Sequence, residues 1–181
     1  MNLSISLLAQ RLQAIELFDS FRTRARLGLL LAALFSRPAG LSDFNQVFPG
    51  LEPNRKYTGI HNIPLEQVTG SVGRPADFDC SFRPLKAHLR ERWVANYLHM
   101  QAGHLEPIRV YKAGSEYFVE DGHHRVSVAR TTGMAFIQAE VWEYQPKLQL
   151  SPVLPSRQVP AMNTCSATAM TCSCELSSQN A

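Results

Sequence analysis

The sequence lacks an apolar run long enough to cross a lipid bilayer. Its longest run, Leu27 to Phe35, is about half of the ~20 residues that a membrane-spanning helix needs. Acidic Glu16 and Asp19 precede this run, where a secretory signal would carry positive charge. These features predict a cytoplasmic protein with no membrane partner.

Cysteine is also scarce, and its placement is uneven. The chain has four cysteines, of which Cys165, Cys172 and Cys174 lie near the C-terminus and Cys80 stands alone. A cluster within a Ser/Thr-rich tail does not have the spacing of a disulfide framework, so free thiols in a reducing compartment are favoured. A metal site in the cluster would need a fourth ligand from elsewhere in the chain.

A strong charge of either sign is absent. The net charge is +3 and 18% of the residues are charged. Dedicated nucleic-acid-binding domains are usually more basic, so this composition permits a DNA partner without requiring one. The 181 residues, 45% of them hydrophobic, suit one soluble globular domain with appendages.

The first forty residues have the pattern of a helical arm. The helical period is followed by Leu8, Leu12, Ile15 and Phe18 or Asp19, and again by Leu27, Leu30, Leu31 and Leu34, which predicts two helices or one bent helix over residues 3–36. Pro38 and Gly40 oppose continuation. The preferred interpretation is a packing arm that covers the main domain or joins a homodimer. A basic surface for nucleic acid, built on Arg22, Arg24 and Arg26, is the alternative.

The remaining residues divide into a linker, a domain and a tail. Residues 41–56 contain proline-based turn signals and are expected to form a loop. Residues 57–144 alternate between β-rich and helical patterns. Residues 145–181 are rich in proline, serine and threonine with few charges, and are predicted to be disordered.

Within residues 57–144 the pattern predicts an α+β fold, a small mixed sheet with packed helices. Strands are expected over 60–68, with a turn at Pro64, and over 136–142, and residues 108–112 and 116–120 are expected to form a hairpin. Helices are expected over 85–99 and 123–132, the second ending at Gly133. No internal repeat is visible.

The junction at Gly122 joins a predicted strand directly to a predicted helix. Glycine permits the tight backbone of such a turn. The first helical turn then offers free N–H groups and the positive end of the helix dipole to an anion. Arg125 adds a planar donor fork, and His123 and His124 add ring nitrogens. The sequence therefore predicts a phosphate-binding turn.

A structural interpretation of the same residues is also available. Asp121 is a residue type that caps helices, and Arg125 could pair with it or with Glu120. Two consecutive histidines point in different directions on a helix, so only one of them is expected to face a ligand.

The string Asp121-Gly122-His123-His124-Arg125, followed by a helix and the strand over 136–142, resembles the ParB/sulfiredoxin superfamily. The similarity spans roughly residues 57–144, including the early strand around Ile63. The resemblance implies a ParB/sulfiredoxin-like fold. It also implies that Gly122, His124 and Arg125 bind a nucleotide phosphate.

Members of that superfamily use this loop for different ends. ParB proteins bind CTP and DNA, sulfiredoxin uses ATP to repair an oxidised cysteine, and a branch of kinases phosphorylates free serine. His123 stands where sulfiredoxin has its reactive cysteine, which argues against that repair, and no helical pattern follows Tyr144 where ParB proteins have a helix-turn-helix domain. The string is more similar to the kinase-like branch, which makes Glu120 and Asp121 the candidate catalytic residues, with Glu120 as base.

A second polar cluster follows the first predicted strand. Ser71, Gly73 and Arg74 lie in a glycine-punctuated loop that could hold a phosphate or a ribose. Asp77 and Asp79 come next and are candidate Mg²⁺ ligands, because Mg²⁺ needs only one or two carboxylates beside substrate phosphates. An ordinary polar loop is the equally weighted alternative.

Three hypotheses follow from these residues. The first is a nucleotide-binding domain, for ATP, ADP or CTP with or without Mg²⁺, in a DNA-associated or regulatory protein. The second is an ATP- or ADP-dependent kinase of a serine-like small molecule, or a nucleotide hydrolase, with Glu120 as base. The third is a scaffold without nucleotide that assembles through its N-terminal helices.

Overall fold

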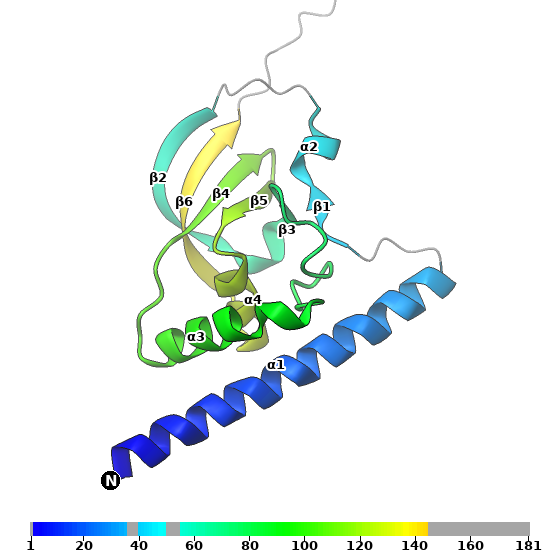
Figure 1. Ribbon diagram of the computed structural model, residues 1–181. Helices are drawn as coiled ribbons and strands as arrows, with labels where there is room; N and C mark the ends of the chain where they lie inside the picture. The colour runs from blue at the N-terminus through cyan, green and yellow to red at the C-terminus, as the bar shows by residue number, and fades with distance from the viewer. Residues whose placement is uncertain (1, 36–39, 50–54, 145–181) are drawn as a thin grey trace, which may run out of the picture. The chain divides into compact units, whose positions relative to one another are not determined.

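A six-stranded mixed sheet in the order β1-β3-β5-β4-β6-β2 organises the chain (Figure 1). The computed structural model describes residues 2–35, 40–49 and 55–144, with side chains from residue 6 onward. The strands are β1 Ser42–Asp43, β2 Arg55–Pro64, β3 Val68–Ser71, β4 Ile108–Ala113, β5 Glu116–Asp121 and β6 Phe136–Tyr144. The helices are α1 Asn2–Leu34, α2 Phe44–Val47, α3 Arg90–Gln101 and α4 His123–Thr131, with 3-10 turns η1 Leu65–Gln67 and η2 Ala87–Leu89.

The predicted α+β class is confirmed, and so is the hairpin. Strands β4 and β5 pair antiparallel, and Gly114 in their turn has a φ of 63°, which a glycine adopts readily. β4 also pairs parallel with β6, while β5 pairs parallel with β3. The expected strand over 60–68 is divided: β2 ends at Pro64, and β3 begins after the η1 turn. The predicted disordered tail, residues 145–181, lies outside the described residues.

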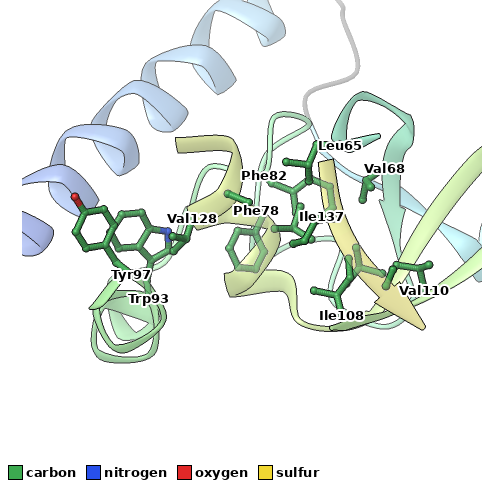
Figure 2. Packing of buried hydrophobic residues seen from close by; sticks show 14 of the residues in the cluster. Leu65, Val68, Phe78, Phe82, Trp93, Tyr97, Ile108, Val110, Val128 and Ile137 are labelled. Atoms are coloured by element: carbon green, nitrogen blue, oxygen red, sulfur yellow. The ribbon is translucent and has the colours of Figure 1, made fainter. Parts of the chain in front are cut away.

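Each face of the sheet has its own hydrophobic cluster. Val119 and Phe118 are neighbours on β5 and therefore point to opposite faces. Val119 belongs to the larger cluster, which also contains Ile108 of β4, Trp93 of α3 and Val128 of α4 (Figure 2). Phe118 belongs to the smaller one. The helices α3 and α4 thus cover one face of the sheet.

The prediction of a loop over residues 41–56 is wrong for most of the residues that the structure describes in this range. Ser42 and Asp43 form β1, α2 follows with Asp43 as its N-cap, and Arg55 already belongs to β2. Phe44 is 3% exposed and packs its ring edge against Phe118 at a centroid distance of 5.3 Å. The turn signals did not reveal this segment because its burial depends on aromatic residues far away in the sequence.

The N-terminal segment is one continuous helix, α1, and its predicted apolar face is buried only in part, at Phe18 and Ile15. Ala14, Phe18 and Ala25 are fully buried. The leucines expected to pack, Leu8 and Leu12 with Leu27, Leu30, Leu31 and Leu34, are 54–77% exposed. Small alanines let the helix approach the domain closely, which the periodicity of leucine could not indicate. The homodimer interpretation stays a prediction.

Charged and aromatic contacts join α1 to α3. Phe18 packs edge-to-face on Trp93 with a centroid distance of 5.8 Å. Arg90 donates to Asp19 at 3.1 Å, and Arg11 donates to Glu91 at 2.7 Å. No described helix has the length and apolar character that a membrane crossing requires.

One buried hydrogen bond joins α3 to α4, and it leads to a stability prediction. The Trp93 indole nitrogen donates to the Ser127 hydroxyl oxygen at 2.9 Å, and both residues are at most 1% exposed. Ser127→Ala leaves the indole N–H buried without a partner, which should cost about 1–3 kcal/mol of unfolding free energy. Urea denaturation measures this cost. Thr131→Ala, on the same helix but partly buried, is the control, and an equal loss in both variants would contradict the prediction.

Candidate functional site

The turn from β5 into α4 is built on Gly122. Asp121 ends β5, and Gly122 is the N-cap of α4 with φ 96° and ψ 20°, in the left-handed region. A Cβ placed on Gly122 would lie 2.5 Å from Cγ2 of Ile108. Only glycine therefore allows the start of α4 to pack this closely on β4. The predicted strand, glycine turn and helix are all present at this junction.

A polar cleft of about 360 Å³ opens at this turn. Its walls come from the end of β5, the first turn of α4, the loop after β3 and the exposed side of α3. Most of its lining side chains are charged, and the others are polar apart from one glycine. The lining residues are Arg74, Arg92, Asn96, Glu106, Glu120, Asp121, Gly122, His123, His124 and Arg125.

Ser71 joins the second polar cluster of the sequence to the turn. Its hydroxyl is fully buried and lies 2.7 Å from Nε2 of His123. The same oxygen accepts a hydrogen bond from the backbone N–H of Arg74 at 3.1 Å. Gly73, with φ 96°, turns the chain between them. The fold thus brings Ser71, Arg74 and His123 together, as a shared site requires.

His124 is the least satisfied polar group of the cleft. It is 7% exposed, and neither ring nitrogen has a hydrogen-bond partner. Burial is the largest cause that lowers the pKa of His124 to about 4, followed by the positive charges of Arg92 and Arg74. His124 is therefore a neutral ring at pH 7, with buried nitrogens that no described protein group uses.

His123 is also neutral, but its ring is anchored. Burial is the largest cause that lowers the pKa of His123 to about 4, followed by the charge of Arg74. Phe78 stacks on this ring at a centroid distance of 6.1 Å and meets the ring of His124 edge-on at 5.5 Å. The two histidines therefore differ in role: one is held by Ser71, and the other is unpartnered.

Arg74 and Arg92 are the uncompensated cations of the cleft. Both are exposed and line its walls, and neither forms an ion pair within the part of the chain that the structure describes. Other cations nearby are already paired: Lys86 lies 2.6 Å from Asp77, and Arg90 pairs with Asp19. Unpaired arginines beside a helix N-terminus attract an anion.

Arg125 is engaged by the protein itself. Its guanidinium donates to the backbone oxygens of Glu106 at 3.1 Å and Pro107 at 2.6 Å, and to the Asp121 carboxylate at 2.7 Å. These bonds fasten the first turn of α4 to the segment that leads into β4. These three hydrogen bonds occupy part of the guanidinium, so fewer of its N–H groups are free for a ligand. The phosphate-binding role expected for Arg125 stays a prediction.

Glu120 and Asp121, the candidate catalytic carboxylates, both line the cleft, but each has partners in the protein. Glu120 accepts a hydrogen bond from the Tyr111 hydroxyl and lies 3.9 Å from Arg55 and 3.8 Å from Arg109. Burial, followed by this hydrogen bond, raises the pKa of Tyr111 to about 12. Asp121 is 69% exposed and pairs with Arg125. A catalytic role for either carboxylate stays a prediction.

The candidate Mg²⁺ ligands lie in a separate turn, outside the lining of the cleft. Asp79 is buried and accepts bonds from the backbone N–H of Ser81 and from the backbone and side chain of Arg83, at 2.7–3.0 Å. Asp77 pairs with Lys86. Among the described residues no group of three or more metal-ligating side chains occurs. Both aspartates have structural partners, and the metal assignment stays a prediction.

Three residues of the cleft were not among the candidate site residues of the sequence: Arg92, Asn96 and Glu106. Asn96 lies one helical turn after Arg92 on α3, and its Nδ2 donates to the Arg92 carbonyl at 2.7 Å. The spacing of four residues places both side chains on one face of the helix, which is a signal that the sequence contains. Which wall that face forms depends on how α3 packs against α4. Glu106 lies in a connecting segment without a motif.

Comparison with known proteins gives a weak structural similarity. No protein-family model matches the chain, and no curated protein matches it. Among solved structures the chain is similar to sulfiredoxin from Arabidopsis thaliana, with 19% identity and a TM-score of 0.35. The similarity covers 45% of this chain and 82% of the sulfiredoxin chain. At this level it transfers no residue role or ligand, so function must be argued from the cleft itself.

Proposed function

We propose that this chain binds a nucleotide through its phosphate groups in the cleft at the start of α4. The observation that carries the proposal is His124. Its two ring nitrogens are buried without partners at the wall of the cleft, and buried polar groups normally have one. A bound group with hydrogen-bonding oxygens would supply the missing partner.

The lining of the cleft carries three arginines and three carboxylates, and the arginines without ion-pair partners favour an anionic ligand. Arg74 and Arg92 contribute two positive charges without ion-pair partners among the described residues. The first turn of α4 adds backbone N–H groups and the positive end of the helix dipole. Phosphate combines negative charge with several acceptor oxygens, and it is the anion that helix N-termini of this kind commonly bind.

The remaining turn residues would act by holding this arrangement. Gly122 allows α4 to start beside β4, and Arg125 fastens its first turn. Ser71 holds the loop of Arg74 through its contact with His123. In this proposal the direct contacts to phosphate come from His124, Arg74, Arg92 and the backbone of α4.

Neither the kinase or hydrolase alternative nor the DNA-associated role has a specific observation in its favour. Glu120, the candidate base, already accepts a hydrogen bond from Tyr111 beside two arginines. Few basic charges around the start of α3 are left for DNA, because Lys86, just before this helix, and Arg90, its first residue, are paired with Asp77 and Asp19. Binding without assigned turnover is therefore the function that the geometry supports best.

Isothermal titration with ATP, ADP and CTP, with and without Mg²⁺, tests the proposal. Arg74→Ala or Arg92→Ala should weaken binding about tenfold each, because each removes one charge-assisted contact worth about 1.4 kcal/mol. Arg24→Ala, an exposed arginine on α1, should leave the affinity unchanged. No binding by any of the three nucleotides, or equal loss in all three variants, would contradict the proposal.

A further inference from the structure

Among the described residues, the lining of the cleft offers a nucleobase no exposed aromatic ring on which to stack. Bases are usually held by aromatic or apolar side chains, and most small-molecule pockets are lined largely by such groups. Six of the ten residues that line this cleft carry formal charge, and no tyrosine, tryptophan or phenylalanine is among them.

The two histidine rings do not fill that role. They are 5% and 7% exposed, so they present almost no ring surface to the cleft. One face of His123 is covered by Phe78, which also meets the ring of His124. What these histidines offer to a ligand is the unpartnered nitrogens of His124.

The aromatic residues suited to stacking are used elsewhere. Arg55 lies over the rings of Tyr111 and Trp142, and Tyr57 packs on Trp142 with a centroid distance of 5.1 Å. Tyr111 packs in the cluster of Phe118, on the face of the sheet opposite to that of Val119 and α4. The Tyr111 hydroxyl donates to Glu120, which lines the cleft, but none of these rings is itself among the lining residues.

From these observations we infer that the cleft selects its ligand by the polyphosphate chain and leaves the base in solvent. The inference rests on the proposed function and extends it to a ligand class: molecules with a chain of two or more phosphates, whether nucleoside triphosphates or inorganic polyphosphate. A volume of about 360 Å³ is near the lower end of the range for ligand pockets, which suits a short phosphate chain.

Asn96 is the one neutral amide in the lining, and an amide can both donate to and accept from the edge of a base. Its Nδ2 already donates to the carbonyl oxygen of Arg92. Asn96 therefore holds its place on α3 and offers a ligand mainly its oxygen. Substitution of Asn96 should change the affinity for different bases equally.

Titration of the full chain with ATP, GTP, CTP, UTP, inorganic tripolyphosphate, AMP and adenosine tests the inference. The four triphosphates and tripolyphosphate should bind within about threefold of one another, and AMP at least about tenfold more weakly. Adenosine should not bind. In Asn96→Ala the ratios among the four nucleotides should stay the same, whereas Arg92→Ala should weaken all of them and tripolyphosphate together.

The outcomes separate the inference from the proposed function. Preference for one base by more than about tenfold, or binding of adenosine, would overturn the inference and leave nucleotide binding in place. Binding of tripolyphosphate alone would support the phosphate-chain site and overturn the nucleotide proposal. No binding of any of these compounds would overturn both.

Discussion

Replacing Gly122 with alanine should destabilise the protein by about 2–5 kcal/mol and abolish ligand binding in the cleft. An alanine at φ 96° costs about 1–2 kcal/mol. Its Cβ would also lie 2.5 Å from Cγ2 and 2.9 Å from Cβ of the fully buried Ile108, and such overpacking costs about 1–3 kcal/mol more. Relief of the clash would move the start of α4 and with it the ring of His124.

Gly73→Ala is the matched control. Gly73 also has a φ of 96°, but a Cβ there would meet no atom within 4 Å. Its cost should therefore be only about 1–2 kcal/mol, the backbone part alone. Urea denaturation of both variants measures the difference. Equal stability losses would mean that the contact of Gly122 with Ile108 is not what fixes the turn.

Acidification from pH 6.5 to 4 should destabilise the free protein through His123 and His124. Burial is the main cause that lowers the pKa of each from 6.5 to about 4 in the folded protein. Between these pH values the unfolded chain binds more protons than the folded one, so stability rises with pH. The full contribution is present above pH 6.5 and is lost as the pH falls to about 4. It is on the order of 3 kcal/mol for each histidine.

Urea unfolding at several pH values between 7 and 4.5 measures this dependence. His124→Gln removes one of the two titrating rings, so the variant should show about half of the wild-type slope over this interval. His123→Gln should do the same, with an additional constant loss from the bond to Ser71. A slope that stays the same in both variants would show that other groups cause the acid sensitivity.

Gly122 and Arg125 show how far the site could be predicted from the sequence. Gly122 and the start of α4 were predicted well, because a glycine between a β-rich and a helical pattern is a local signal. The partners of Arg125 were not, because the carbonyls of Glu106 and Pro107 come from a segment with no motif. An arginine beside a glycine turn suggests phosphate equally well whether its donors are free or occupied.

The long helix and the linker also combine a feature that local sequence predicts with one that depends on distant residues. Periodicity predicted a helical arm and included the buried Phe18, but it also assigned burial to the leucines, whereas Ala14 and Ala25 face the protein. The residues of β1 and α2 resembled a loop because only two strand residues and Phe44 carry the contact. In both cases the deciding factor was the shape of the surface opposite, which no local pattern contains.

The sequence by itself determined the α+β class, the β4–β5 hairpin and the glycine turn into α4. These features depend on backbone preferences and on residues near one another in the chain. Only the tertiary structure decided which polar groups are free to bind a ligand. It paired Arg125, Glu120 and Asp79 with protein groups, and left His124, Arg74 and Arg92 around one cleft. The reason is that a hydrogen bond or ion pair between distant segments forms only after the sheet and helices have packed.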